Sequence, residues 1–120
     1  LNRNWARAIV EVRGIGETSW SPDLQWLIRR SAMLTGRTVA SMRVYDCLRA
    51  LDVLFSLDWI DRKKVVVFGS GEMAVVALYA ALLNGRVSGV ILHDPPASQN
   101  VSSLFLVLDL IVTLGRKNST

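Results

Sequence analysis

The chain has 120 residues, of which 51% are hydrophobic and 20% are charged, a composition that matches one globular domain. Its net charge of +4 is spread over short basic clusters without interleaved aromatic residues, which argues against a nucleic-acid-binding surface. The single cysteine, Cys47, excludes an internal disulfide and a thiolate zinc cluster, and with one histidine we predict no metal site. The most apolar stretch, residues 104–114, is shorter than the roughly 20 residues that span a bilayer, so we expect no membrane segment.

Neither end of the sequence has the features of a natural start or of a sorting signal. The chain begins with Leu1, carries no charged segment followed by a cleavable apolar stretch, and ends on the polar residues 116–120. We therefore expect residues 1–120 to be one partial domain that is truncated at both ends. The composition leaves the compartment open, because one thiol is compatible with either redox environment.

The first half of the chain predicts one strand, one glycine-rich loop and two helices. Residues 8–12 are a short β-rich run, and two glycines within residues 13–18 indicate a turn with unusual backbone angles. A Ser-Pro start and a later glycine predict a short helix over residues 23–33. Over residues 38–57 apolar side chains recur at intervals of three and four, which predicts an amphipathic helix. The apolar positions of this helix are Val44, Cys47, Leu48, Leu51, Leu54 and Phe55.

The second half of the chain predicts a strand, a tight turn and a helix in direct succession. Residues 65–68 are a continuous β-branched and aromatic run, as in buried parallel strands. The glycine-rich residues 69–73 then lead at once into a helix of small residues over 74–83. A third strand over residues 87–92 and a last helix over residues 101–114 complete the pattern.

Strands and helices alternate along the sequence, which is typical of a parallel sheet with helical crossovers. We therefore predict an α/β fold with three layers, α/β/α, around a parallel sheet. About three strands are predicted, fewer than the roughly five or six of an average sheet. Such a sheet leaves apolar edges unpaired, so we expect the chain to hold only part of an α/β core.

The turn at residues 69–73 is the main candidate for a functional site. A nucleophile elbow, G-x-S-x-G, needs small residues two positions before and after the nucleophile, because its sharp turn brings them close together. Gly69 supplies the first small residue, but Gly71 takes the nucleophile position and Met73 the second small position. Shifting the register makes Ser70 the nucleophile and puts bulky residues in the crowded positions. We therefore interpret Ser70 as a turn residue and keep it as a secondary catalytic candidate.

The same turn also fits the dinucleotide fingerprint G-x-G-x-x-A through Gly69, Gly71 and Ala74. Asp94 stands near the end of the following predicted strand, where an acid would bind the ribose of NAD or NADP. Such a fingerprint usually opens its own sheet, whereas a strand, a glycine loop and a long helix precede this one. A Rossmann-type unit with Asp94 as the ribose ligand remains the alternative interpretation.

Three stretches carry family-like motifs: residues 10–18 with Arg13-Gly14-Ile15-Gly16, residues 43–54, and residues 92–98 with Asp94-Pro95-Pro96. They resemble, in the same order, parts of α/β-hydrolases of the bacterial acetyl xylan esterase-like and dipeptidyl-peptidase-like families. Residues 10–18 look like their strand and R-G-x-G-x-[ST] loop. Residues 43–54 are similar to the helix that precedes the elbow strand, and residues 92–98 look like the acidic-Pro-Pro stretch after the next strand. The resemblance therefore extends over most of the chain, from about residue 8 to residue 98.

This resemblance implies a serine hydrolase that acts on small esters or related acyl bonds without a cofactor, through a serine, a histidine and an acid. Carried over by position, it assigns the oxyanion amide to Glu72 and the nucleophile slot to Gly71. It draws the usual acid and histidine from later strands, so His93 is expected to be structural and Asp94 is an alternative acid. We therefore expect an esterase-like segment that is catalytically incompetent by itself. Its partners would be the rest of a larger hydrolase domain and a small ester substrate.

Overall fold

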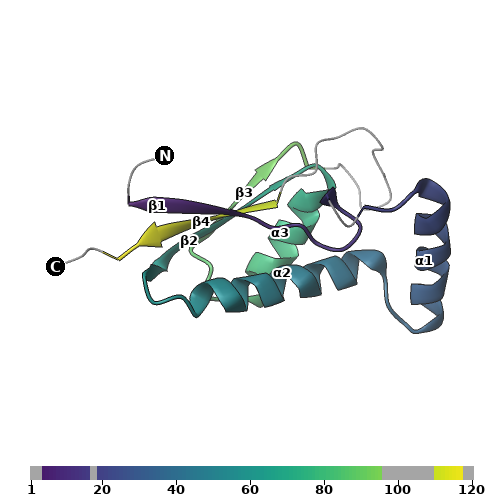
Figure 1. Cartoon of the computed structure of the whole chain (residues 1–120), viewed down its shortest axis with the longest axis horizontal. Coiled ribbons are helices and arrows are strands. Elements are labelled where there is room, and N and C mark those ends of the chain that lie inside the picture. The colour runs from purple at the N-terminus through teal and green to yellow at the C-terminus, as the bar shows by residue number, and fades with distance from the viewer. Residues whose placement is uncertain (1–3, 17–18, 96–109, 118–120) are drawn as a thin grey trace.

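The computed structural model describes residues 4–16, 19–95 and 110–117 of the chain. Figure 1 shows the described elements, which combine strands and helices in an α/β arrangement. In chain order they are β1 (Trp5–Ile9), α1 (Pro22–Leu34), α2 (Val39–Phe55), β2 (Ile60–Ser70), α3 (Glu72–Leu83), β3 (Gly89–His93) and β4 (Leu110–Arg116).

The four described strands form one sheet in the order β1-β4-β2-β3. β2 and β3 are parallel, whereas β4 lies between β1 and β2 and is antiparallel to both. The predicted α/β class is confirmed. The predicted parallel sheet of about three strands is wrong, because a fourth strand of opposite direction lies within it.

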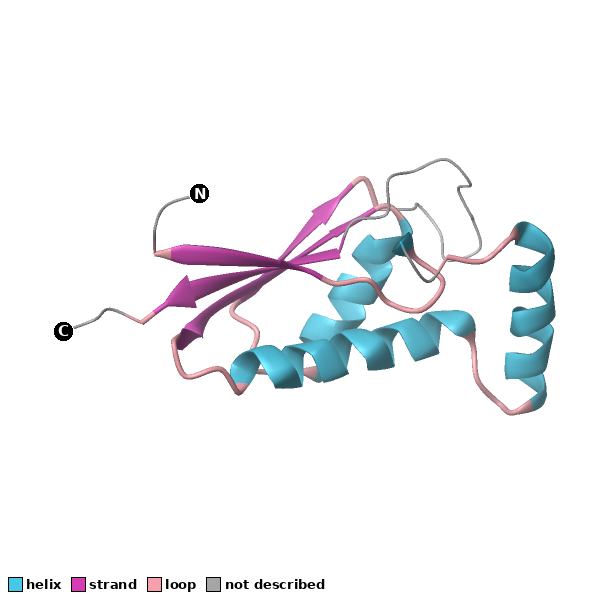
Figure 2. Ribbon diagram, viewed as in Figure 1, coloured by secondary structure: helices cyan, strands magenta, loops and turns pink. Residues whose placement is uncertain are grey.

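The helices α2 and α3 lie on the same side of the sheet (Figure 2). α3 connects β2 to β3 and packs on both strands, while α2 packs mainly against α3. α1 stands at the N-terminal end of α2 and contacts only α2 among the described elements (Figure 1). The described helices and the sheet thus form two layers, and a third layer is not among the described elements.

Side-chain caps explain where α1 and α2 begin. The Ser21 hydroxyl accepts a hydrogen bond from the Leu24 amide at 3.3 Å, and Pro22 opens α1 with a backbone angle that already suits a helix. The Thr38 hydroxyl accepts a hydrogen bond from the Ser41 amide at 3.0 Å, and the Ser41 hydroxyl accepts one from the Thr38 amide. The helices predicted over residues 23–33 and 38–57 are confirmed, with ends that differ by no more than two residues.

The core lies between the sheet and the α2–α3 layer. Alternate residues of the central strands point into it, such as Val67 and Val112, which pair in register and are fully buried. The predicted apolar face of α2 contributes Cys47, Leu51 and Phe55, which are also buried. The 3.6-residue periodicity of this segment therefore predicted correctly which face of the helix packs inward.

Strand boundaries differ from the prediction because pairing extends them. The strand expected over residues 8–12 is β1, which begins and ends three residues earlier along β4; Val12 is buried beyond its end. β2 begins upstream of the predicted run, because Ile60 already pairs with Arg116 before an irregularity that precedes Val65. Propensity located β2, β3 and the last two residues of β1, whereas pairing with a partner strand determined where each strand begins and ends.

The helix predicted over residues 101–114 is wrong for its last five residues, 110–114, which belong to β4. Residues 101–109 lie outside the described residues. Buried and partly buried side chains alternate through most of β4, the period of a strand with one covered face. A short apolar run does not distinguish a strand from a buried helix, and here β1 and β2 supply backbone partners on both sides.

The face of the sheet opposite α2 and α3 carries a row of apolar side chains, which we call the open row. The register places Ile9, Ile111, Phe68 and Ile91 side by side across β1, β4, β2 and β3. Ile9 is 74% exposed and Ile91 is 54% exposed. No helix in the described part of the chain covers this row.

Candidate functional site

The turn between β2 and α3 lies at the edge of the sheet where the parallel strands β2 and β3 both end. Gly71 has a φ of 60° and a ψ of −130°, a backbone conformation that residues with a side chain rarely adopt. Its amide donates a hydrogen bond to the His93 carbonyl at 3.0 Å, and its carbonyl accepts one from the Ala74 amide at 3.0 Å. The turn is therefore sharp, dependent on glycine and tied to the neighbouring strand.

Gly69 brings the strand and the helix into close contact on either side of this turn. A Cβ atom at Gly69 would overlap the Met73 carbonyl oxygen and would lie 2.7 Å from the Ala77 Cβ and 2.8 Å from the Ala74 Cα. A side chain would therefore not fit at position 69, two residues before Gly71. Met73, at the second small position, is buried in the core cluster, so its side chain is accommodated there.

The other predicted site residues gather at the same edge. Ser70, the last residue of β2, pairs in register with His93, the last residue of β3, and Asp94 follows with a φ of 50°. The His93 ring stacks on the Phe68 ring, with centroids 6.3 Å apart. Ser70, Gly71 and Asp94 lie at one edge because the parallel strands β2 and β3 end there.

The glycine loop after β1 is fixed by an ion pair to α2. The Arg13 guanidinium donates two hydrogen bonds to the Asp46 carboxylate, at 2.8 and 2.6 Å, and the Arg13 amide donates a third at 3.1 Å. These hydrogen bonds hold the pKa of Asp46 below its usual value, and partial burial opposes that shift. Gly14, with a φ of 80°, leaves space for the Trp20 ring, which a Cβ atom there would overlap. We call the Arg13–Asp46 pair the loop clamp.

Arg43 links this loop to the turn between β2 and α3. Its Nε donates a hydrogen bond to the Arg13 carbonyl at 3.1 Å, its Nη1 lies 3.9 Å from Glu72 Oε2, and its guanidinium lies over the Trp20 ring at 5.9 Å. Arg43 is only 6% exposed, and burial is the main cause that lowers its pKa. The two glycine turns, 57 positions apart at Gly14 and Gly71, are therefore connected through one buried arginine.

The sequence did not predict the burial of Arg43. Arg43 and Asp46 stand one turn apart at non-apolar positions of an amphipathic pattern, which is typical of a solvated face. The N-terminal half of α2 instead lies against the loop after β1, where Arg43 and Asp46 contact Arg13. Only the arginine at the start of the R-G-x-G motif hinted at an acidic partner, and nothing in the sequence showed which acid it would be.

Cys47 lies in the core, as predicted from its position on the apolar face of α2. The side chain is fully buried, and burial raises the pKa of its thiol to about 11, with the nearby Asp46 carboxylate adding to the shift. A thiol with so high a pKa is almost entirely protonated at neutral pH and is a poor nucleophile. The packing role expected from the sequence is therefore supported by both burial and charge state.

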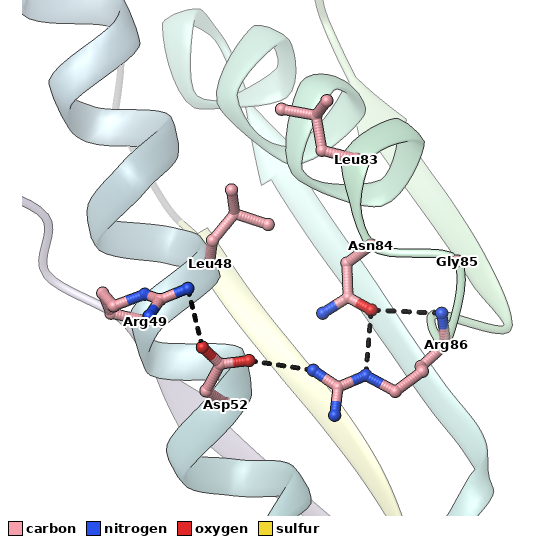
Figure 3. Close-up of a pocket in the computed structure, with 7 residues that line it drawn as sticks. All are labelled: Leu48, Arg49, Asp52, Leu83, Asn84, Gly85 and Arg86. Atoms are coloured by element: carbon pink, nitrogen blue, oxygen red, sulfur yellow. Dashed lines mark hydrogen bonds and ion pairs between the residues drawn. The ribbon is translucent and has the colours of Figure 1, made fainter.

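A shallow hollow of about 370 Å³ lies between the second half of α2 and the turn after α3 (Figure 3). Asp52 is its centre: it accepts a hydrogen bond from Arg86 at 2.8 Å and pairs with Arg49 at 2.9 Å. The Arg86 Nε and amide also donate to the Asn84 side-chain oxygen, and its guanidinium lies over the Phe55 ring. These contacts tie α2 to the α3–β3 turn, so the polar groups of the hollow are occupied in holding the fold.

Comparisons of this chain with protein-family models, with curated proteins and with solved structures found no match. The described residues contain no helix that is long and apolar enough to cross a membrane. They also contain no group of three or more histidine, cysteine, aspartate or glutamate side chains that could hold a metal ion. The turn between β2 and α3 and its surroundings are therefore the features of this chain that bear on its function.

Proposed function

We propose that this chain is an esterase-like segment of the α/β-hydrolase type, in which the elbow turn is kept as a scaffold without a nucleophile. The observation that carries the proposal is the backbone of Gly71, with its φ of 60° and ψ of −130° between a strand and a helix. A nucleophile elbow imposes a strained turn of this kind on its central residue and projects that residue's side chain above the sheet. Here the central residue has no side chain to project.

Two contacts around the turn support the same proposal. The close approach of Gly69 to the first turn of α3 satisfies the steric demand of an elbow two positions before its centre. Arg43 links the R-G-x-G loop to Glu72, so two of the stretches that resemble hydrolase elements meet at the turn. The elements follow one another in the order that the resemblance implies, and they contact one another around this turn. Both observations are expected of a single site.

The proposed site is catalytically incompetent for acyl transfer. The amide of Glu72, which follows the elbow centre, is in the position of an oxyanion donor. An acyl-enzyme intermediate needs a hydroxyl or thiol at the elbow centre, and Gly71 offers neither. Ser70 and Asp94 lie at the same edge and are the alternative nucleophile and acid that the experiment below tests.

The proposal assigns the open row to the rest of a larger hydrolase domain. A three-layer α/β/α core needs helices on both faces of its sheet, and the open row is an apolar surface on the second face. Further elements of such a domain would cover this row and supply the acid and histidine of a triad. A small ester substrate would then belong to the complete domain.

Labelling with a fluorophosphonate and hydrolysis of p-nitrophenyl acetate test the proposal. The unmodified chain and its Ser70→Ala variant are expected to show neither labelling nor turnover above buffer. The Gly71→Ser variant is also expected to stay unlabelled, because the proposal assigns the histidine and acid that would activate a serine to the rest of the domain. Labelling of Ser70 in the unmodified chain would show that the elbow is not empty, and labelling of residue 71 in a folded Gly71→Ser variant would contradict the proposed incompetence of this chain.

A Rossmann-type dinucleotide site is the second candidate, because one observation favours it. β2 and β3 are adjacent parallel strands joined by α3, so Asp94 follows β3 at the same edge as the N-terminus of α3. NAD(H) and NADP(H) titrations followed by nucleotide fluorescence test this arrangement, with Asp94→Ala as the variant that removes the ribose ligand. Binding that weakens in Asp94→Ala would replace the hydrolase proposal.

A further inference from the structure

A groove runs between α2 and α3 and reaches α1. Its volume is about 930 Å³, near the upper end of the roughly 300–1,000 Å³ of small-molecule sites. All three helices contribute to its apolar wall. The apolar side chains are Met33 of α1, Val44 and Leu48 of α2, and Val76, Tyr79 and Leu83 of α3.

Three charged side chains line the end of the groove that lies near the N-terminus of α3. Arg43 and Glu72 face each other there at 3.9 Å, and Arg29 of α1 lies close enough to lower the pKa of Arg43 by repulsion, in addition to the larger effect of burial. Two guanidinium groups and one carboxylate leave an excess of one positive charge. The groove is thus apolar along its length and positively charged at one end.

The guanidinium of Arg43 is incompletely paired. It is 6% exposed, and its Nε is used by the Arg13 carbonyl. The 3.9 Å from Nη1 to Glu72 Oε2 is longer than a hydrogen bond, and no other carboxylate of the described residues lies within 4.0 Å of the Nη atoms, although Asp46 is near enough to attract the Arg43 charge. A buried cation is costly unless it is paired and hydrogen-bonded, and a carboxylate can accept two parallel hydrogen bonds from a guanidinium.

We propose that this groove binds an alkyl carboxylate, with the carboxylate between Arg43 and Arg29 and the alkyl chain along the apolar wall of α2 and α3. The ligand class follows from the pairing of one anionic end with a long apolar body. Binding here requires no nucleophile and no hydrolase chemistry. The inference is therefore independent of the proposed function of the elbow turn.

Isothermal titration of the full chain with decanoate tests this inference, with decan-1-ol as the uncharged ligand of the same length. Decanoate is expected to bind with a stoichiometry of one and decan-1-ol about tenfold more weakly, because the alcohol cannot pair with the guanidinium groups. Methyl NMR spectra are expected to shift for Val44 and Val76 in the groove, and not for Val90 on β3. Equal affinity for the two ligands, or no binding of decanoate, would overturn the inference.

The variant Arg29→Glu places the opposite charge at the same end of the groove without touching the core, because Arg29 is exposed. It is expected to weaken decanoate binding about tenfold. The matched control is Arg30→Glu, since Arg30 is also exposed on α1 but does not line the groove. Equal losses of decanoate affinity in Arg29→Glu and Arg30→Glu would mean that net charge alone causes the effect, and would contradict the site.

The variant Arg43→Met removes the buried guanidinium and is expected to abolish the preference for decanoate over decan-1-ol. Far-ultraviolet circular dichroism and a thermal melt establish whether this variant is folded. If it does not fold, the Arg29→Glu and Arg30→Glu pair decides the question. A folded Arg43→Met variant that keeps the preference would refute the proposed role of Arg43.

Discussion

The two glycine turns of this protein follow the strands β1 and β2, and different interactions hold them. Side-chain contacts stabilise the turn after β1: Arg13 binds Asp46, and the Trp20 ring fills the space beside Gly14. The turn therefore depends on a charge pair that solvent can reach, since Arg13 is 41% exposed.

Backbone contacts stabilise the turn after β2. The Gly71 amide binds the His93 carbonyl, and Gly69 packs directly against the backbone of α3 at Met73 and Ala74. We therefore expect the stability of the first turn to depend on charge and pH. The stability of the second turn should depend on added side-chain volume and on lost backbone freedom. Five experiments test this contrast.

The largest effect is expected at Gly69. The variant Gly69→Val puts side-chain atoms where the Met73 carbonyl and the Ala77 methyl already lie, and we expect a loss of about 4 kcal/mol or more. Urea unfolding followed by circular dichroism measures this loss. Gly85→Val is the matched control, because no atom lies within 4 Å of a Cβ at Gly85. Comparable losses in both variants would mean that packing does not hold the second turn.

Gly14→Ala is expected to cost about 3 kcal/mol, from a left-handed backbone angle together with overlap of the new methyl with the Trp20 ring. Gly36→Ala separates these two contributions. Gly36 has a φ of 76°, close to that of Gly14, but no atom within 4 Å of its Cβ position. Denaturant midpoints of the two variants should differ, and their difference measures the Trp20 contact. Equal midpoints would show that Trp20 does not support the loop.

Gly71→Ala is expected to cost about 2 kcal/mol, because an L side chain must adopt the φ of 60° that the turn imposes. Thermal melts of the variant and the parent provide the measurement. A neutral or stabilising effect would show that the turn can relax, and it would remove the geometric support for an elbow at this position.

Asp46→Asn removes the charge of the loop clamp and is expected to cost about 1.5 kcal/mol, the contribution of a hydrogen bond to a charged group. Asp52→Asn is the control on the same helix, since Asp52 pairs with the two arginines Arg49 and Arg86 but is 41% exposed, against 23% for Asp46. Exposed pairs contribute about 0.5 kcal/mol. If Asp46→Asn loses no more stability than Asp52→Asn, the contrast between the two turns would not hold.

The stability contributed by the loop clamp is expected to depend on pH. Hydrogen bonds from Arg13 hold the pKa of Asp46 below its usual value in the folded chain. The contribution is therefore complete above the ordinary pKa of about 4 and is lost as the pH falls through the lowered value. Urea midpoints of the parent should fall more steeply than those of Asp46→Asn below about pH 4. Parallel profiles for the two proteins would contradict this.

Most local elements could be predicted from the sequence, because neighbouring residues specify them. The spacing of apolar residues such as Cys47 and Leu51 was sufficient for α2, and the glycines before α3 were sufficient for a sharp turn between a strand and a helix. The parallel pairing of β2 and β3 around a helical crossover was also predicted, from the alternation of strand and helix. Each of these features depends on residues that are close in the chain or on one pairing.

Three features could not be predicted, and each depends on contacts between distant residues. Residues 110–114 are a strand because β1 and β2 leave a place between them, and an apolar run alone fits a helix equally well. The burial of Arg43 follows from the position of the loop after β1, 30 residues earlier in the chain. The groove at Arg43 exists only because α1, α2 and α3 enclose it.

The sequence by itself therefore determined the periodic elements, the glycine turns and the absence of a side chain at residue 71. These are properties of propensity, spacing and residue identity, which act within a few residues. The antiparallel strand in the middle of the sheet, the loop clamp and the incompletely paired guanidinium of Arg43 follow from tertiary contacts. Their physical reason is the same: hydrogen bonding and burial are completed by whichever partners the fold brings together, and local patterns do not name those partners.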